Sequence, residues 1–574
     1  MKKPMLSEMT LREKIGQMLA PHQWDVYGKN EANYDGKTCN MEQVRARYEK
    51  EQFGTLRGEQ VGVYYTDPRH SMEFEHEGEF AEGDLFAYGK IRVPAAPYKE
   101  YLEEQAGWMK IPPVVGCDCA IGGANVFEDM SRIVNANAIG AADSEELTFA
   151  LGASVARELR CGGFNWRWCP VLDIGNRNSH SCMRTFAIDD IDRTIRLSKA
   201  YALGMQSEGV AATAKHFPSE GRIESRDAHF TTTTNTDSLE TWWSEQGKVY
   251  QALFDAGVYA VMVGHQSFPA QDDTIVGGQY IPATISKKIV TDLLKEEMGF
   301  KGVVITDGIG MAGLFNLLPY EELIVALVNA GNDVILGSKM SSSDLIEQAV
   351  LDGRISESRI DDACQRVLDM KEKLGMFKEN YNQLPYTLAE VVHETQRINR
   401  EIARRSMTLI RDRHDLLPLN QEKIKKVSII ASTHTDHFMK ELEVLKQAFE
   451  DRGIQVYMQR RLKNAQELKE ISNHSDLIIY AAFVQMHAPK GAIRLVGDEC
   501  QTYYYAFTHG KEKSIGVSFG YPYIHYDTME NADAFINAYC TAPESMEAFV
   551  QAIFGEIEIV GKSPVLLIPR ANSR

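Results

Sequence analysis

The feature that most constrains the fold is a run of short apolar segments, each followed by an ionisable residue. The segments and their following residues are 112–116 with Asp118, 166–172 with Asp173, 209–214 with Lys215 and His216, 258–264 with His265, and 302–306 with Asp307. A further apolar segment, 332–336, follows. Helical patterns of ten or more residues separate these segments, at 144–160, 190–208, 239–256 and 287–298. Repeated strand and helix units predict an α/β fold with a parallel sheet, and a run this long predicts a closed (β/α)8 TIM-like barrel.

The position of the ionisable residues points to function. In a (β/α)8 barrel the catalytic side chains come from the carboxyl ends of the strands. Five such strand ends in succession therefore predict a catalytic site at the barrel mouth, although Asp173 and His265 could each instead hold a neighbouring loop.

The N-terminal part is harder to interpret. Thr10-x-x-Glu13 resembles a capping box, and it opens an amphipathic helix with Leu11, Ile15, Met18 and Leu19 on one side. Residues 23–110 show no lasting period and contain the acidic run 73–82. We expect one strand near 61–65 and otherwise loops that cap a site or meet a partner.

The chain is long enough for two large domains. We assign 1–375 to the barrel, with 23–110 as an atypical inserted or rim segment, 376–404 to a linker and connecting helix, and 405–574 to a smaller α/β sandwich. Apolar strands of the second domain are expected at 427–431, 454–458, 476–483 and 514–519, in a mainly parallel sheet. The sequence shows neither GxGxxG nor GxxxxGK[ST] there, which gives a nucleotide role little support.

Composition excludes several classes of partner. The net charge of -18 repels phosphate backbones and anionic lipid, so we expect neither nucleic acid nor membrane as a partner. The nine cysteines show no CxxC pair and are interpreted as reduced and structural. With no apolar leader segment and no run of ~20 apolar residues, the sequence predicts a cytoplasmic protein.

Asp307 and the stretch 215–230 carry the candidate chemistry. Asp307 follows a buried strand and stands beside Gly308, so its carboxylate could act as nucleophile, general base or metal ligand. A structural alternative is that it caps a helix starting near Met311.

Asp227 and His229 are two residues apart on a loop. Their side chains can hydrogen-bond only if the backbone turns between them. If that bond forms, the carboxylate fixes the imidazole tautomer and favours the imidazolium, which makes His229 a proton donor near pH 7.

The sequence resembles a family 3 glycoside hydrolase, in its β-N-acetylglucosaminidase branch. Nearly the whole chain except 23–110 takes part in the resemblance. The stretches that carry it are 9–19, Pro170-Val-Leu-Asp173, Met183-Arg-Thr-Phe186, Lys215-His-Phe-Pro218, Asp227-Ala-His229, 282–286, 298–307 with Met311, 406–411, 416–419 and 516–523.

The resemblance implies a barrel followed by an α/β sandwich and a retaining, two-step hydrolysis of terminal β-linked N-acetylglucosamine (GlcNAc). Asp307 would attack the anomeric carbon, while His229, oriented by Asp227, protonates the departing oxygen. Four residues match positions that hold the sugar: Asp118, Arg184, Lys215 and His216. The implied substrate is a GlcNAc-containing oligosaccharide or a peptidoglycan fragment. No metal or organic cofactor is implied.

The sequence departs from the family pattern in two loops. Where the family has Asp-x-Glu-Gly-Gly, this chain has Asp118-Cys-Ala-Ile-Gly-Gly123, without the Glu, and the Arg usual in this branch after the glycines is missing. Ser219-Glu220-Gly221 replaces a Gly-His-Gly or Gly-Asp-Gly. These changes bear on the leaving group more than on the reaction.

Other functions stay open at this point. Phosphate could replace water, which gives a β-N-acetylglucosaminide phosphorylase; a β-glucosidase or β-xylosidase needs only a different sugar; and a catalytically inactive sugar-binding protein would tolerate the altered loops. Substrate-assisted cleavage through Asp498 and Glu499 would place the chemistry in the second domain.

Overall fold

The computed structural model describes residues 2–28, 40–61, 64, 69, 92–433, 437–484, 494–495, 497–509, 513–530 and 532–567. The acidic run 73–82 lies outside these residues. The chain forms two compact units. Unit 1 comprises Met1–Arg132, Thr148–Gly175 and Ser198–Thr395, and unit 2 comprises Ile133–Leu147, Asn176–Leu197 and Gln396–Arg574. Within the described ranges, no helix is long and apolar enough to cross a membrane.

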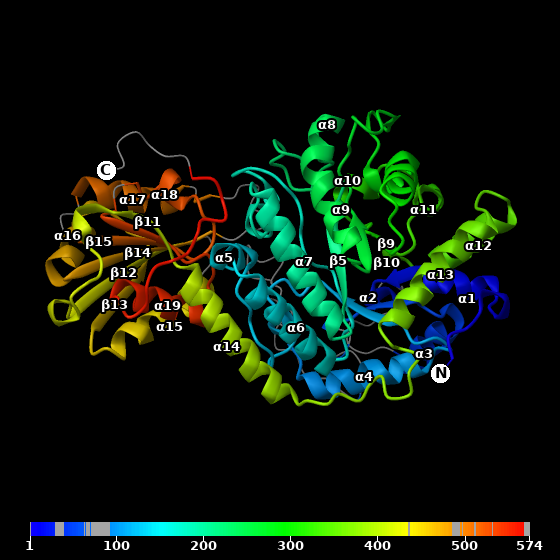
Figure 1. The fold of residues 1–574 in the computed structure, drawn as a ribbon, viewed down its shortest axis with the longest axis horizontal. Coiled ribbons are helices and arrows are strands. Elements are labelled where there is room, and N and C mark those ends of the chain that lie inside the picture. Colours follow the sequence, from blue (N-terminus) through cyan, green and yellow to red (C-terminus); the bar gives the residue numbers. More distant parts are fainter. Residues whose placement is uncertain are drawn as a thin grey trace. The chain divides into compact units, whose positions relative to one another are not determined.

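Unit 1 is built on eight short parallel strands, with helices outside them (Figure 1). They are β1 Leu19–Pro21, β2 Thr55–Arg57, β3 Val114–Cys117, β4 Trp166–Arg167, β5 Ala211–Phe217, β6 Ala260–Val263, β9 Val303–Thr306 and β10 Ile335–Ser338. Strands β2 to β6 and β9 form one sheet, and β10 pairs with β1.

Two further contacts close the ring of strands. Ile305 of β9 bridges to Val334, which directly precedes β10. Gly54, directly before β2, donates its N–H to Gly16 O in helix α1 (Leu11–Gln17) (2.7 Å), which holds the start of β2 beside the segment that leads into β1. The TIM-like barrel predicted from the apolar segments is thus confirmed.

Apolar side chains fill the barrel interior. Trp166 and Trp168 of the β4 segment are 0% and 1% exposed and pack edge to face, with ring centroids 6.4 Å apart. Trp166 Nε1–H donates to Thr213 Oγ1 of β5 (2.8 Å), which satisfies the buried indole. The same cluster includes Val114, Ala211, Ala260, Met262, Val303, Ile305, Val334 and Leu336. Burial of these residues accounts for the strands being apolar up to their carboxyl ends.

The helices that lie wholly or mainly in unit 1 alternate with the strands. They are α1 Leu11–Gln17, α2 Gln23–Val26, α3 Met41–Glu51, α4 Ala95–Gly107, α6 Glu145–Cys161, α7 Ile191–Ser207, α8 Leu239–Trp242, α9 Lys248–Asp255, α10 Ala312–Phe315, α11 Tyr320–Ala330, α12 Ser342–Leu351 and α13 Glu357–Lys373, with a π-helix at Lys288–Glu297 and a β7 Ile275–Val276 to β8 Gln279–Tyr280 hairpin. The capping box predicted for α1 is present, because Thr10 Oγ1 accepts from Glu13 N–H (3.2 Å) and Glu13 Oε2 from Thr10 N–H (2.9 Å).

Two N-terminal predictions were wrong. Leu19 does not continue helix α1, which ends at Gln17; it starts β1 and pairs with Ile335. The buried sheet position outweighs the helical apolar pattern that continues through Met18. The expected strand near 61–65 lies instead at Thr55–Arg57 (β2), and residues 62, 63 and 65 are outside the described part of the chain.

Unit 2 contains a six-stranded sheet of order β11-β16-β15-β14-β12-β13. The strands are β11 Thr408–Asp412, β12 Lys426–Thr433, β13 Gln455–Arg460, β14 Leu477–Phe483, β15 Ser514–Ser518 and β16 Ala534–Asn537. β11 is antiparallel to β16, and the other pairs are parallel. The predicted, mainly parallel sheet is therefore present, with β11 and β16 as strands that the sequence reasoning did not assign.

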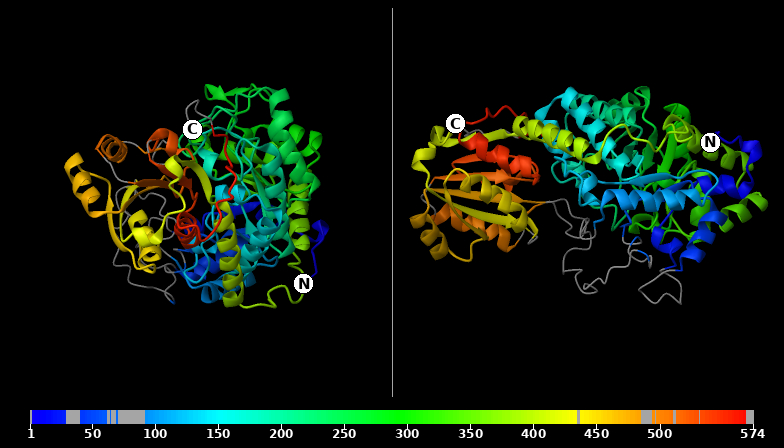
Figure 2. Two further views of the ribbon diagram at one scale, coloured as in Figure 1. Left: turned by 60° about the vertical axis from the view of Figure 1, so that its left-hand side comes forward. Right: turned by 90° about the horizontal axis from the view of Figure 1, so that it is seen from below.

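Helices cover both faces of this sheet (Figure 2). On one face lie α15 His437–Glu450 and α19 Pro543–Ile553, where Phe438 stacks on Phe483 (4.9 Å) and Phe549 meets Phe519 edge to face (5.9 Å). On the other lie α16 Ala465–His474, α17 Asp498–His509 and α18 Ile524–Asp527. The remaining helices are α5 Ala136–Ala142 and α14 Leu388–Ser406, which crosses from unit 1. The unit is an α/β sandwich.

Unit 2 also takes in two segments from earlier in the chain. Cys182, Met183 and Ile188 belong to the same buried cluster as Tyr480 and Phe535 of the sheet. The predicted domains, a barrel followed by a sandwich, assigned these early segments to the barrel, whereas the structure groups them with unit 2.

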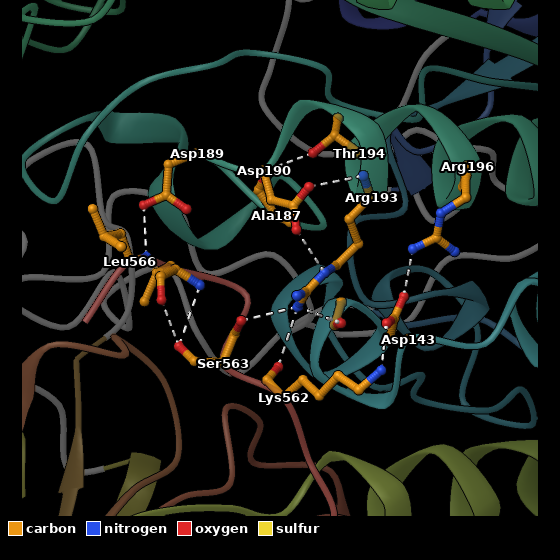
Figure 3. A network of polar contacts seen from close by, with 12 residues as sticks. Asp143, Ala187, Asp189, Asp190, Arg193, Thr194, Arg196, Lys562, Ser563 and Leu566 are labelled. Atoms are coloured by element: carbon orange, nitrogen blue, oxygen red, sulfur yellow. Dashed lines mark hydrogen bonds and ion pairs between the residues drawn. The ribbon is translucent and has the colours of Figure 1, made fainter.

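Polar contacts bind these early segments to the C-terminal segment (Figure 3). Arg193 Nη1 donates to Ser563 O (2.9 Å), and Asp189 Oδ2 accepts from Leu566 N–H (2.7 Å). Asp143 pairs with Arg196 (2.9 Å) and with Lys562 (3.1 Å). Although its partial burial acts in the opposite sense, these cations lower the pKa of Asp143.

Candidate active site

Asp307 stands directly after β9, on the carboxyl side of the barrel. Its backbone N–H donates to Val263 O at the end of β6 (2.8 Å), and its Oδ1 accepts from Gly308 N–H (2.7 Å). Helix α10 begins after Met311, which provides its N-cap without a side-chain bond. The capping alternative for Asp307 is therefore wrong, and its half-buried side chain stands at the carboxyl end of a barrel strand, where catalytic side chains lie in such folds.

Basic groups surround Asp307. Burial opposes its ionisation, but the charges of His216, His265, Lys215 and His229 outweigh burial and hold the pKa of Asp307 well below its usual range. The carboxylate is consequently ionised over the whole range in which a folded enzyme works, as a nucleophile must be.

Lys215 and Asp118 come from two strands and meet at the mouth. Lys215 Nζ donates to Asp118 Oδ1 (2.5 Å). The Lys215 side chain is 4% exposed and that of Asp118 is 38% exposed. The buried ammonium thus fixes a carboxylate that is still open to a ligand.

His216 is held from both sides. Asp173 Oδ2 lies 2.8 Å from His216 Nδ1, and Gln266 Nε2 donates to His216 O (2.7 Å). The β5 to β6 register shifts between Lys215 and Phe217, so His216 lies in a bulge, a device that often aims a side chain near an active site. Asp173, one of the five flagged strand ends, is a positioning residue here.

His265 holds the loop that carries Asp307. Its Nδ1 lies 3.0 Å from Thr284 Oγ1, and its Nε2 lies 2.9 Å from Gly308 O. Burial lowers the pKa of His265, while Asp307 raises it less strongly. These contacts give His265 the structural role that the sequence left open.

Asp227 and His229 form the pair that depended on a turn. Asp227 Oδ1 lies 2.7 Å from His229 Nδ1 and also accepts from His229 N–H (2.9 Å). Phe230 N–H donates to Asp227 O (3.0 Å), which closes the turn. The carboxylate thus engages Nδ1, the contact that fixes the tautomer and orientation of the ring.

The loop that carries this pair contacts the segment after Asp307. Ala312 N–H donates to His229 O (3.1 Å), and Thr232 Oγ1–H donates to Gly313 O (2.8 Å). Gly313 has no room for a Cβ, which would approach Thr231 O to 2.9 Å. The candidate acid/base and the candidate nucleophile are thereby linked through the backbone.

Glu224 organises the same loop and was missed in the sequence. Its carboxylate accepts from the N–H groups of Ser225 (2.9 Å), Arg226 (2.9 Å) and Thr234 (2.9 Å), and from Arg226 Nη2 (2.6 Å). Burial opposes ionisation, but these donors lower the pKa of Glu224 to about 2. Only the local crowding of charged residues in Glu224-Ser-Arg-Asp227 could have hinted at this role.

Arg184 belongs to a different unit from the other candidates. It follows the 3-10 helix His180–Met183 in unit 2, whereas Asp118, Lys215, His216, the Asp227–His229 pair and Asp307 lie in unit 1. Its role in sugar binding stays a prediction. Across the described part of the chain, no group of three or more His, Cys, Asp or Glu side chains could hold a metal ion.

Known proteins are similar to this chain in sequence. The profile of the Glycosyl hydrolase family 3 N terminal domain matches residues 90–370. A beta-N-acetylglucosaminidase/beta-glucosidase of Cellulomonas fimi is 28% identical over 485 residues, which is 79% of this chain and 84% of that protein. A beta-hexosaminidase of Xanthomonas oryzae pv. oryzae (strain MAFF 311018) is 31% identical over 232 residues, 39% of this chain and 67% of that one.

Solved structures share the fold. A family 3 beta-N-acetylglucosaminidase from Paenibacillus sp. str. FPU-7 aligns over 97% of this chain and 99% of its own, with a TM-score of 0.77 and 22% identity. The beta-glucoside phosphorylase BglX bound to 2FGlc aligns over 98% and 95%, with a TM-score of 0.80 and 24% identity.

A barrel of this kind with relatives of these names defines an enzyme that cleaves glycosidic bonds. The chain belongs to glycosyl hydrolase family 3.

Proposed function

We propose that the protein is a retaining, exo-acting β-N-acetylglucosaminidase that removes terminal β-linked GlcNAc. The observation that carries the proposal is the 2.7 Å contact between Asp227 and His229, on a loop joined by backbone to the segment after Asp307. The names of the curated relatives, beta-N-acetylglucosaminidase and beta-hexosaminidase, support the choice of sugar.

In the first step Asp307 attacks the anomeric carbon and forms a glycosyl ester. His229 Nε2–H gives its proton to the departing oxygen, while Asp227 holds Nδ1–H and stabilises the imidazolium beforehand. The low pKa of Asp307 keeps the nucleophile ionised while the imidazole is protonated, so both groups are in their working forms together.

In the second step His229, now neutral, takes a proton from water, which attacks the ester and releases GlcNAc. Two displacements at one carbon retain the β configuration. Asp118, Lys215 and His216 bind the sugar's hydroxyls and acetamide in this proposal, and so does Arg184. The chemistry requires no metal or organic cofactor, because the nucleophile is a side chain and a proton activates the leaving group.

The sugar and the stereochemistry can be tested together. Release of nitrophenol from the β-N-acetylglucosaminide should exceed release from the β-glucoside and β-xyloside by at least about 10-fold in kcat/KM, the size of effect that one well-made polar contact gives. NMR of the first product should show the β-anomer. Faster turnover of the glucoside, or an α-anomer as first product, would contradict the proposal.

One observation also favours phosphorolysis as a second function. The proposed acid/base is an imidazole, which is neutral at the ester stage and repels an incoming phosphate less than a carboxylate would. Turnover in phosphate buffer would then give GlcNAc 1-phosphate. Free GlcNAc as the sole product in phosphate buffer would leave hydrolysis alone.

A further inference from the structure

Large apolar side chains are exposed in the segments that follow β5, β6 and β9. They are Ile223 (73% exposed) and Phe230 (53%) after β5, Ile275 (58%) and Tyr280 (41%) after β6, and Phe315 (41%) after β9. These three strands are neighbours in the sheet, so the segments leave the barrel on one side of its carboxyl end. We call these five residues the apolar rim.

Contacts join the three segments into one surface. Ser267, after β6, donates its N–H to Thr233 O (2.9 Å) and its Oγ–H to Tyr280 O (2.8 Å). A Cβ on Gly277, in the turn of the β7 to β8 hairpin, would approach Leu317 Cδ1 to 2.7 Å, so the hairpin touches the segment after α10. The loop after β5 is joined to α10 by the hydrogen bonds described above. The apolar rim is therefore continuous rather than a set of scattered side chains.

The apolar rim adjoins the candidate active site. Phe230 directly follows His229 in the chain. Phe315 ends α10, and Ala312, which begins that single turn, donates its N–H to His229 O (3.1 Å). Although burial opposes it, the charge of His229 is among those that lower the pKa of Asp307, so the two side chains lie close together. Both aromatic rings thus belong to the two segments that meet at the candidate acid/base.

The Phe315 ring is held in place by a cation. Lys339, directly after β10, has its Nζ 5.2 Å from the centroid of the Phe315 ring and 4.3 Å from that of Tyr320. Its backbone N–H donates to Tyr320 OH (2.8 Å). A cation over an aromatic face is attracted to it. The exposed ring is thereby fixed before a ligand arrives, and it loses little conformational entropy when a ligand covers it.

The reaction indicates what covers this surface. A contiguous exposed apolar patch marks a place where a ligand or a partner binds. When His229 protonates the departing oxygen, the group attached to that oxygen lies beside the loop that carries His229, and hence beside the rim. A pyranose ring has an apolar face of C–H groups that can pack on an aromatic ring, while its hydroxyls stay in water.

We propose that the apolar rim binds the leaving group, with Phe230 and Phe315 packing against the apolar face of a sugar ring next to the scissile bond. This role rests on the proposed glycosidase function. It identifies the leaving group as a second sugar ring of an oligosaccharide rather than a small alcohol.

The test compares leaving groups attached to one sugar. Wild type, Phe230→Ala and Phe315→Ala are assayed on the β-1,4-linked GlcNAc disaccharide and on the β-fluoride of GlcNAc, whose leaving group has no ring. On the disaccharide each variant should lose about 5- to 20-fold in kcat/KM, the effect of one aromatic contact and the area that it covers. On the fluoride the loss should stay below about 2-fold, because no atom of the leaving group reaches the rim.

Phe149→Ala on α6 is the matched control. It removes the same ring at 42% exposure from a helix outside the rim, and it should change kcat/KM for neither substrate. An equal loss on both substrates would show that the rim residues only support the site, and no loss on either would show that they do not contact the leaving group; each result overturns the proposal. No loss combined with a changed sedimentation coefficient would show that the rim joins copies of this chain instead.

The proposed function can fail separately from this inference. A wild type that cleaves only β-glucosides would overturn the choice of sugar, and the same comparison between a glucose disaccharide and glucosyl fluoride would still decide the role of the rim. A wild type inactive on every one of these glycosides would overturn the glycosidase function, and the rim would then have no leaving group to bind.

Discussion

The two ends of the barrel in unit 1 use the same kinds of charged residue in opposite ways. At the amino end, Asp333 is fully buried and binds Lys295 Nζ (2.7 Å), Val304 N–H (2.9 Å) and Arg359. At the carboxyl end, Asp307 accepts a bond from its own loop, and its cationic neighbours act on it through space. The oxygens of Asp333 are bonded to protein donors, so this carboxylate stabilises the fold. Asp307 is held ionised by its neighbours, so it can react with a ligand.

Asp307→Ala should have the largest effect on activity. Removal of the nucleophile should lower kcat by at least about 10⁴-fold on nitrophenyl β-GlcNAc, as removal of covalent catalytic groups does elsewhere. The midpoint of thermal unfolding should fall much less than in Asp333→Ala, because among the described residues Asp307 accepts a hydrogen bond from Gly308 N–H, whereas Asp333 binds three partners. Retained activity would show that Asp307 is not the nucleophile, and the functional difference between Asp307 and Asp333 would then disappear.

Asp333→Ala should invert this result. Loss of one partner of a buried ionic network leaves Lys295 and Arg359 uncompensated and should cost about 3–5 kcal/mol in the free energy of unfolding. Turnover measured at low temperature should stay close to wild type. Urea unfolding measures the difference, and Asp369→Ala, which removes a part-exposed pair with Lys3 and a hydrogen bond from Gln365 Nε2, should cost about 1 kcal/mol.

His229→Ala should reduce activity in a manner that depends on the leaving group. General acid catalysis contributes about 10²–10⁴-fold, so hydrolysis of a disaccharide should fall by that factor. A dinitrophenyl glycoside needs no protonation, and its first step should be nearly unaffected. His393→Ala, an exposed change on α14, is the control. An equal fall for both substrates would exclude His229 as the acid.

Glu224→Gln should lower activity by about 10-fold through the loop alone. Each hydrogen bond to a charged acceptor contributes on this scale, and Gln keeps the shape without the charge. Because the pKa of Glu224 is about 2, below its usual 4.5, the carboxylate stabilises the loop above pH 4.5 and ceases to do so as pH falls toward 2. The ratio of variant to wild type should therefore stay constant from pH 5 to pH 8. Exposed Glu240→Gln on α8 should change nothing.

Lys371→Met should have the smallest effect on activity and act on stability, where the lost hydrogen bond to Gln17 Oε1 costs about 1–3 kcal/mol and the pH dependence changes. Burial lowers the pKa of Lys371 from 10.5 to about 7. Between these values the unfolded chain binds a proton that the folded chain does not, so wild-type stability gains from rising pH in that window. The variant should lack this gain, whereas exposed Lys373→Met should keep it. Identical pH slopes for Lys371→Met and wild type would contradict the lowered pKa of Lys371.

Much of the barrel follows from sequence pattern because its strands are buried on both faces. Six of the eight strands were recognised as apolar runs, and only β1 and β2 were missed. β1 has three residues and continues the apolar spacing of α1, so helical and extended patterns coincide at Leu19. Whether Leu19 is helical or extended depends on its pairing with β10, more than 300 residues away in the chain. Local propensity does not contain that information.

Some residues of the candidate site were predicted from the sequence, and others were found only in the structure. Strand ends led to Asp118, Lys215, His216 and Asp307 without any coordinates. The Asp227–His229 contact depended on a turn that sequence could state only as a condition. Glu224 acts through backbone N–H groups, and such acceptors leave no trace in residue spacing.

Unit 2 includes two segments from early in the chain, Ile133–Leu147 and Asn176–Leu197, and this affects folding during synthesis. Cys182, Met183 and Ile188 leave the ribosome long before Phe535, their neighbour in the core, which follows roughly 350 residues later. At about 5–20 residues per second this gap lasts roughly 20–70 s. During that time the part of the sheet that buries these apolar side chains has not yet been synthesised. A nascent chain stopped before residue 535 should therefore bind chaperones, and residues 396–574 expressed alone should aggregate.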